Sequence, residues 1–435
     1  MMRWREFSAA VLPAVAAFAL SGIYCIADGF FVGRSIGDQG LSAINIAYPV
    51  VSLIQSCGTG IGMGGAVLWE LKRACGEEEE AHRYLQTGVW MLVIASALLT
   101  CGLFPVIDPM LRLLGAEGTV LEMGRAYLRV IIPGALFQVL ATGLVPVIRN
   151  DGGAVTAMVV MILGFVTNIV LDDLMIWVWK LGTTGAAAAT VLGQLVTAVG
   201  ALLYVLRHRL PVWGQGISAG KALGILKVAV APFGLTLCPM LSLMLINRAC
   251  MQSGGASAVA CYACIAYAVT IVQLLMEGVG DGSQPLMSRS FGEGRPDRLK
   301  SVRRMAYTAA LLLALLSDGL LFALRDKIGP LFGASGSVAA AVAEVMPVFL
   351  LGMGFYGISR VATSGFYATG RNLPAYLCVY AEPTLLLILL WILPGQLGQA
   401  GVWWSVVLSQ ILTAVLALFL QLRTKGFPPM EKDAA

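Results

Sequence analysis

The chain has 435 residues, of which 58% are apolar and only 12% are charged, and its formal net charge is +5. A soluble protein carries about twice that charged fraction, so a soluble globular domain is excluded and lipid surrounds most of the chain. The excess of Lys and Arg follows from membrane topology, as shown below, and gives no reason to expect a nucleic-acid partner.

The sequence has few of the residues that catalytic or metal sites in proteins require. The only two histidines, His82 and His208, fall in polar connections, which argues against Ser-His-Asp chemistry in the membrane. Cys261 and Cys264 would share a helix face, but no His or further Cys lies close in sequence, so packing is favoured over a metal site. We expect a protein that is not an enzyme and has no bound cofactor.

Twelve apolar runs are long enough to cross a bilayer as helices, which takes about 20 residues each. None of them alternates with period two, so barrel strands are not expected. The first run is too long for a signal-peptide core and has no convincing cleavage site. The predicted spans lie near residues 8–32, 42–68, 86–107, 125–147, 156–179, 183–206, 226–249, 257–287, 304–324, 343–368, 374–394 and 400–422.

The distribution of basic residues predicts the orientation of these spans. With the N-terminus inside, the cytoplasmic segments hold 20 Lys or Arg and the outer segments hold 8, while Arg360 stays within a helix. Cytoplasmic loops of membrane proteins carry this kind of excess. We therefore expect a multi-pass protein of the cell membrane with both termini in the cytoplasm.

The two halves of the chain repeat one another. Gln55 matches Gln273, which sets an offset of 273 − 55 = 218 residues. A nearly constant offset across both halves indicates an internal repeat. Glycine pairs at the same offset are Gly60 and Gly278, Gly62 and Gly280, Gly64 and Gly282, Gly76 and Gly294, Gly134 and Gly352, and Gly152 and Gly370.

Six spans per half is an even number, so the two copies have the same orientation and are related by an axis along the membrane normal. We predict an all-α membrane protein with twelve transmembrane helices in two parallel six-helix repeats. The N-terminal lobe covers residues 1–210, a cytoplasmic linker 211–225, and the C-terminal lobe 226–435. The glycine run at 58–65 lies inside a span, so close helix packing explains it better than phosphate binding.

Ionisable groups inside a span are costly and are therefore candidates for function. Asp28, Asp172 and Thr190 lie at similar depth in the outer half of their spans. Tyr24 precedes Asp28 by four residues and Asn168 precedes Asp172 by four, so each pair shares a helix face. Such oxygens suit Na⁺, at Asp28, Asn168 and Asp172 above all, and the carboxylates equally suit a proton. In the alternative interpretation, each Asp caps a broken helix or accepts structural hydrogen bonds.

This polar set occurs in the first half only. The positions that match Asn168, Asp172 and Thr190 in the second half are Leu386, Leu390 and Val406. A purely architectural requirement should recur in both copies of a repeat. The asymmetry favours a specialised cation site in the N-terminal lobe.

Other polar residues within the spans leave several roles open. Glu277 and Asp281 lie four apart near the inner end of the eighth span, where they either line a cleft or face cytoplasmic water. Asp318 and Glu382 are candidates for a second-lobe proton site or for contact with a drug. Pro13 removes a backbone hydrogen bond within the first span, which fits either a passive kink or a hinge.

The combination of motifs resembles the prokaryotic branch of the multidrug and toxic compound extrusion (MATE) transporters. The resemblance implies a V-shaped, two-lobed exporter of cationic or amphiphilic drug-like compounds, coupled to H⁺ or Na⁺. It also implies that Tyr24, Asp28, Asn168, Asp172 and Thr190 form the cation site and that the first helix bends at Pro13. The segments that carry the resemblance are Ala27–Arg34, Ile148–Gly152, Asn168–Asp172, Gly185–Thr190 and Gln284–Leu286.

A second function class stays open alongside antiport. Related folds include flippases for lipid-linked saccharides or phospholipids, which should have a more basic cavity. Basic residues within the spans reduce essentially to Arg360, which favours the exporter. We expect a monomer whose partners are drug-like small molecules and the lipid bilayer.

Overall fold

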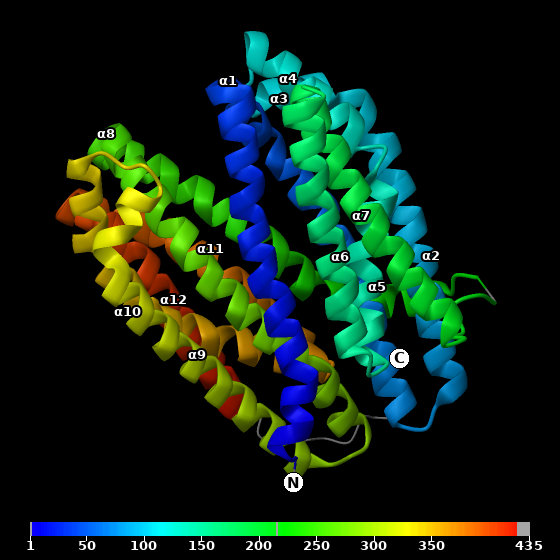
Figure 1. The fold of residues 1–435 in the computed structure, drawn as a ribbon. Helices are drawn as coiled ribbons and strands as arrows, with labels where there is room; N and C mark the ends of the chain where they lie inside the picture. The colour runs from blue at the N-terminus through cyan, green and yellow to red at the C-terminus, as the bar shows by residue number, and fades with distance from the viewer. Residues whose placement is uncertain (1, 215, 424–435) are drawn as a thin grey trace. The chain divides into compact units, whose positions relative to one another are not determined.

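The computed structural model describes residues 2–214 and 216–423, except for the side chains of residues 25–35 and 38. Asp28 is therefore outside the described side chains. Over the described residues the protein is helical without strands, which confirms the predicted all-α class (Figure 1). The elements are α1 (Trp4–Ala74), α2 (Glu78–Leu103), η1 (Phe104–Val106), α3 (Ile107–Leu113), α4 (Gly118–Ile131), α5 (Ala135–Asn150), α6 (Ala154–Asp172), η2 (Asp173–Val178), α7 (Gly182–Arg207), α8 (Ala219–Gly292), α9 (Pro296–Leu331), α10 (Gly336–Ala368), α11 (Asn372–Leu397) and α12 (Gln399–Arg423).

The predicted number of spans is recovered within the described part of the chain. Ten helices are long and apolar enough to cross a membrane, and α4 with α5, bent by 59°, forms an eleventh span. The twelfth comes from α8, whose 74 residues are broken by non-helical dihedrals at Gly255. Gly37 breaks α1 in the same way. Apolar length alone located each span, because about 20 residues are needed to cross the hydrocarbon.

The repeat is also visible in the backbone. Gly37 and Gly255 have φ angles of 73° and 65°, and they lie 255 − 37 = 218 residues apart. Left-handed φ angles favour glycine, which has no Cβ. Helix ends show the same pattern, since a left-handed glycine follows a helix at Gly76 and Gly294, Gly115 and Gly333, and Gly152 and Gly370. The repeated glycines of the sequence therefore mark the same breaks and C-terminal caps in both halves.

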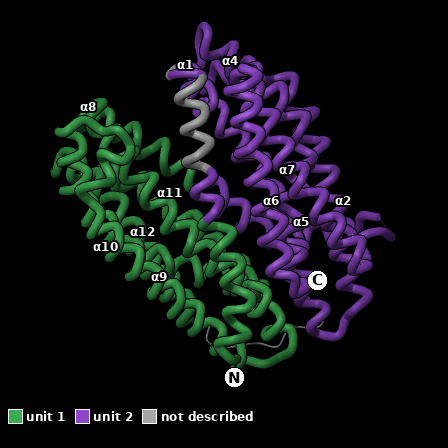
Figure 2. The backbone as a smooth tube through the Cα atoms, in the orientation of Figure 1, with its two compact units in different colours: residues 1–19, 238–434 green, residues 20–237, 435 purple. Residues whose placement is uncertain are grey.

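The chain divides into two compact units, coloured separately in Figure 2. Unit 1 contains residues 1–19 and 238–434, and unit 2 contains residues 20–237. These units differ from the predicted lobes, which begin at residues 1 and 226. The start of α1 belongs with the second half of the sequence, and the start of α8 belongs with the first half.

Within unit 1, glycines of α8 make room for the start of α1. A Cβ atom added to Gly278 would lie 2.6 Å from the Cα of Val15, and one added to Gly282 would lie 2.8 Å from the Cα of Val11. No side chain fits at such distances from a backbone. The two glycines are four residues apart, so they form one small-residue face on which another helix can rest.

Unit 2 repeats this arrangement with the roles exchanged. A Cβ atom on Gly60 would lie 3.0 Å from the carbonyl oxygen of Ala229, and one on Gly64 would lie 2.6 Å from that of Ile225. Here α1 supplies the glycines and α8 supplies the crossing helix. The prediction that the glycine run serves close helix packing is confirmed, and this packing explains why the first helix of each repeat joins the opposite unit.

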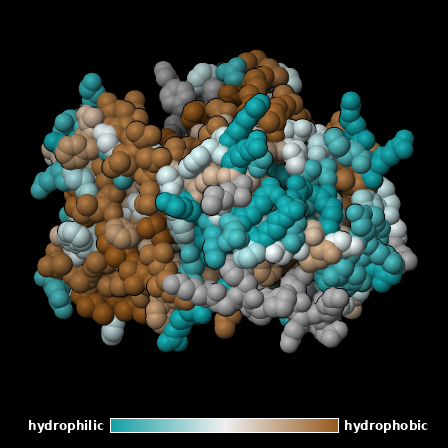
Figure 3. All heavy atoms as spheres, turned by 90° about the horizontal axis from the view of Figure 1, so that it is seen from below, coloured by the Kyte–Doolittle hydropathy of each residue, from teal (hydrophilic) through white to brown (hydrophobic). Residues whose placement is uncertain are grey.

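The surface separates lipid-facing flanks from water-facing ends. Large apolar side chains are exposed along the helices, among them Leu315 and Leu316 of α9 and Trp391 of α11. The molecule seen from below shows hydrophilic side chains over a broad area of that end (Figure 3). Exposed apolar flanks with polar ends are the pattern that a bilayer requires.

Candidate functional site

The candidate site lies where α6 changes its helical form. α6 ends at Asp172, and η2 continues from Asp173 as a π-helical turn. Such turns widen a helix by one residue and often occur at functional sites. Asp172 is therefore the last residue of regular α-helix before the widened turn, with its carboxylate completely buried.

Asn168, one turn before Asp172, contacts α7. Its side chain is 3% exposed, and its Nδ2 donates to the Oγ1 atom of Thr190 over 3.4 Å. Thr190 in turn donates to the carbonyl oxygen of Ala186 over 3.0 Å. The Oδ1 atom of Asn168 is buried and has no hydrogen-bond partner among the described residues. The structure thus brings Asn168 and Thr190 into contact, and the buried Asp172 carboxylate belongs to the next turn of α6.

Glycines allow α6 and α7 to approach at this level. A Cβ atom on Gly193 would lie 2.8 Å from the carbonyl oxygen of Gly164 and 2.9 Å from the Cβ of Asn168. Any larger residue at position 193 would push against the side chain that carries the site. The spacing of the two helices, and with it the Asn168–Thr190 contact, therefore depends on these two small residues.

Tyr24 approaches the same stretch of α6 from α1. Its ring stacks on that of Phe165, with centroids 5.3 Å apart and planes at 9°. Stacked aromatic pairs contribute beyond their buried area, so this pair fixes Tyr24 one turn from Asn168. No local sequence pattern indicated Phe165, because its partner Tyr24 lies on a distant segment. The place of Asp28 in the site stays a prediction.

The candidates in the second half form a different cluster. Glu277 of α8 makes an ion pair with Arg360 of α10, with Oε1 and Nη2 2.8 Å apart. The hydroxyl of Tyr356 donates to the same Oε1 over 3.2 Å, and that of Tyr367 donates to Asp281 over 3.4 Å. Glu277 and Asp281 thus share one face of α8 that is turned toward α10. The two tyrosines and the pairing of Arg360 were missed from the sequence.

Of the remaining candidates, Glu382 belongs with the Glu277–Arg360 cluster. No hydrogen bond or ion pair joins Asp318 or Pro13 to this cluster among the described residues. Glu382 on α11 is within electrostatic range of Arg360. Asp318 on α9 has a buried Oδ1 without a hydrogen-bond partner in the described part of the chain. Pro13 lies in α1 between the two contacts with α8 and keeps helical dihedrals. Its role as a hinge stays a prediction.

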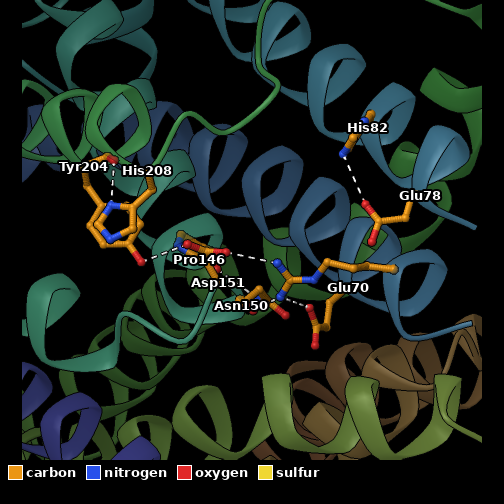
Figure 4. Close-up of polar contacts among 9 residues, drawn as sticks. Glu70, Glu78, His82, Pro146, Asn150, Asp151, Tyr204 and His208 are labelled. Carbon is orange, nitrogen blue, oxygen red and sulfur yellow. Dashed lines mark hydrogen bonds and ion pairs between the residues drawn. The ribbon is translucent and has the colours of Figure 1, made fainter. Parts of the chain in front are cut away.

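A polar network that the sequence did not indicate ties together the C-terminal ends of α1, α5 and α7 (Figure 4). Arg73 pairs with the buried Glu70 at 2.5 Å and with Asp151 at 3.0 Å. Asp151 also accepts a hydrogen bond from Tyr204 over 3.0 Å, and His208 stacks on the Tyr204 ring. The network explains the Ile148–Gly152 segment as a structural junction, since Arg73 bridges the Asp151 and Glu70 carboxylates.

The family follows from a match to both repeats. A family model described as MatE matches residues 13–174 and 232–392. The chain belongs to the MatE family. This is a family of membrane transporters, so the MatE chain is not an enzyme.

Relatives and solved structures share the fold of this MatE chain over nearly its whole length. The multidrug export protein MepA of Staphylococcus haemolyticus is 22% identical over 415 residues, which cover 94% of this chain and 91% of MepA. The outward-facing structure of a multidrug resistance MATE family transporter of the MOP superfamily gives a TM-score of 0.91 at 21% identity, covering 96% of this chain and 95% of that one. A MOP superfamily transporter from Pyrococcus furiosus gives a TM-score of 0.89 at 21% identity, with the same coverage.

Proposed function

We propose that this MatE protein is a secondary-active exporter that moves cationic or amphiphilic drug-like compounds out of the cell in exchange for H⁺ or Na⁺. Multidrug export by the similar MepA proteins supports the class of function. The observation that carries the proposal of ion coupling is the buried Asp172 carboxylate one turn from Asn168, which is itself buried and bonded to Thr190.

The charge around Asp172 supports a cation at this point. α6 contains no Lys or Arg, and the only basic residue of α7 is Arg207 at its inner end. Amide and hydroxyl oxygens such as those of Asn168 and Thr190 suit Na⁺, and a buried carboxylate such as that of Asp172 suits Na⁺ or H⁺. Binding of a cation from outside in one state of the transporter shifts the equilibrium between states.

The matching positions of the second half support a single site of this kind. Leu386, which corresponds to Asn168, is 2% exposed, and Val406, which corresponds to Thr190, is 8% exposed. The two positions are thus packed apolar core in unit 1. The same helical frame carries oxygen ligands in one half and hydrocarbon in the other, which argues for chemistry rather than architecture.

The environment of Arg360 favours an exporter over a flippase. A flippase for phosphate-bearing lipids needs basic groups that are free to meet a phosphate. The Arg360 guanidinium already pairs with Glu277, and breaking a buried pair is costly. An interior with acidic side chains and one neutralised base suits cationic cargo better.

Transport by purified protein in liposomes tests the proposal. The liposomes hold the protein with a fluorescent cationic dye such as ethidium, and Na⁺ and pH gradients are imposed separately. We expect dye movement to accelerate under at least one gradient and fluorescent phospholipids to stay in their leaflet. Dye movement that ignores both gradients, or lipid scrambling without dye movement, would contradict the proposal.

A further inference from the structure

The Arg360 side chain is largely buried inside unit 1. It is 10% exposed, and that of its partner Glu277 is 18% exposed. Glu277 Oε1 accepts from both the guanidinium and the Tyr356 hydroxyl. The planar guanidinium thus fills one side of the carboxylate, and a phenol fills another.

Acidic groups outnumber basic groups around this pair. Asp281 and Glu382 both lie within electrostatic range of Arg360, so three carboxyl groups face one guanidinium. In a membrane interior each uncompensated charge is expensive. The titratable and charged groups around the Glu277–Arg360 pair are Asp281 and Cys238 of α8, Tyr356 and Tyr367 of α10, and Glu382 of α11.

The repeat shows that this arrangement is special to the second half. Glu277 and Arg360 match Thr59 and Thr142, since 277 − 218 = 59 and 360 − 218 = 142. The Thr142 hydroxyl donates to the carbonyl oxygens of Gln138 and Val139, over 2.9 Å and 3.4 Å. The ion pair between Glu277 and Arg360 therefore has no counterpart at the two matching threonines of the first half.

We propose that Arg360 is a resident cation of the second half. Its guanidinium neutralises Glu277 and occupies the side of the carboxylate where H⁺ or Na⁺ would otherwise bind. The inference rests on the proposed ion coupling and assigns that coupling to the first half alone. Removal of the guanidinium should convert Glu277 into an ion-binding group.

The test measures ion-dependent melting of the purified full-length protein. Melting temperatures are compared in NaCl and choline chloride of equal concentration, and across pH. Asp172→Asn should abolish the response of the first half. Adding Arg360→Gln to that variant should raise the melting temperature by about 2–4 °C when Na⁺ or H⁺ is added. Adding Glu277→Gln as well should remove this increase.

Matched variants keep the proposal open to contradiction. Arg360→Lys retains the positive charge and should stay unresponsive in the Asp172→Asn background. Glu277→Gln in the wild-type background should change the half-saturating ion concentration by less than about twofold, and this measurement decides even if Arg360→Gln does not fold.

A larger change, or an Asp172→Asn protein that still responds through Glu277, would overturn the proposal. So would a folded Asp172→Asn/Arg360→Gln protein without a new shift. A wild-type protein without any ion-dependent shift would instead contradict the proposed coupling, while the double variant would still test Arg360.

Discussion

Two neighbouring carboxylates at the end of α6 have very different surroundings. Asp172 is fully buried beside Asn168, whereas Asp173 is exposed. Asp172→Asn and Asp173→Asn change the net charge of the protein by the same amount, but only Asp172→Asn removes a buried carboxylate. Comparing the two variants therefore separates the effect of the buried charge from the effect of net charge. We expect Asp172→Asn to reduce gradient-driven dye transport by about tenfold or more, since it removes the charge that binds the ion. Asp173→Asn should stay within about twofold of wild type. Equal losses in the two variants would contradict a role specific to Asp172.

The Thr190 hydroxyl gives a finer test at the same scale. Thr190→Val keeps the shape of the side chain but removes the oxygen that accepts from Asn168 over 3.4 Å. A lost hydrogen bond or ligand costs about 1 kcal/mol, so the half-saturating ion concentration should rise by about five- to tenfold. Titration of dye transport with Na⁺ or H⁺ measures this change. Thr197→Val on the same helix is the control, because Thr197 bonds only the carbonyl oxygen of Gly193. A Thr190→Val protein with the affinity of wild type would remove Thr190 from the site.

Residue spacing within one helix could be predicted, and contacts between helices could not. Asn168 and Asp172 share a face because four residues nearly complete a turn. The stacking of Tyr24 on Phe165 and the pairing of Glu277 with Arg360 depend on how separate helices pack, which no local pattern contains. For the same reason, the sequence did not predict that Asp281 faces Tyr367.

Helix packing depends on glycines whose neighbours are backbone atoms. A Cβ atom on Gly62 of α1 would lie 2.3 Å from the Cα of Gly143 in α5, whereas one on Gly319 of α9 would meet nothing within 4 Å. Gly62→Ala should therefore destabilise the protein by about 1–3 kcal/mol through overpacking. Gly319→Ala should change the stability by less than about 1 kcal/mol. Thermal unfolding in detergent measures both, and equal stabilities would contradict the close approach of α1 to α5.

At the scale of helices, the sequence predicts where the helices lie but not where they break or which unit they join. Helix ranges were predictable because apolar length is a local property. The break at Gly37 was not, because the chain has 50 glycines and only the backbone shows which of them adopt left-handed dihedrals. The exchange of the first helices between units was also missed, since it requires knowing that Gly60 and Gly278 each receive a helix from the other repeat.

The predicted orientation of the whole molecule can be tested with a native thiol. Cys75 is exposed in the turn between α1 and α2, which the distribution of Lys and Arg places in the cytoplasm. Burial and the neighbouring Glu77 raise the pKa of the Cys75 thiol, so labelling should accelerate as pH rises and thiolate forms. An impermeant maleimide should label Cys75 in inside-out vesicles only.

A thiol in a predicted outer loop gives the matched control. Ser335 is exposed before α10, and Ser335→Cys in a protein that lacks Cys75 and Cys101 should be labelled in intact cells. The reverse pattern for the two thiols would show that both termini lie outside.

Reciprocal coupling tests the central claim, that the buried cation site of the first half drives export. Because two coupled ligands affect one another equally, a dye gradient alone should drive ions in the opposite direction across liposomes that start without an ion gradient. The measurement follows internal pH or ²²Na⁺ after dye is imposed on one side. The account predicts ion movement with wild type and Asp173→Asn, and none with Asp172→Asn although that protein still binds dye. Ion movement that persists in Asp172→Asn, or dye transport by wild type without any ion movement, would contradict it.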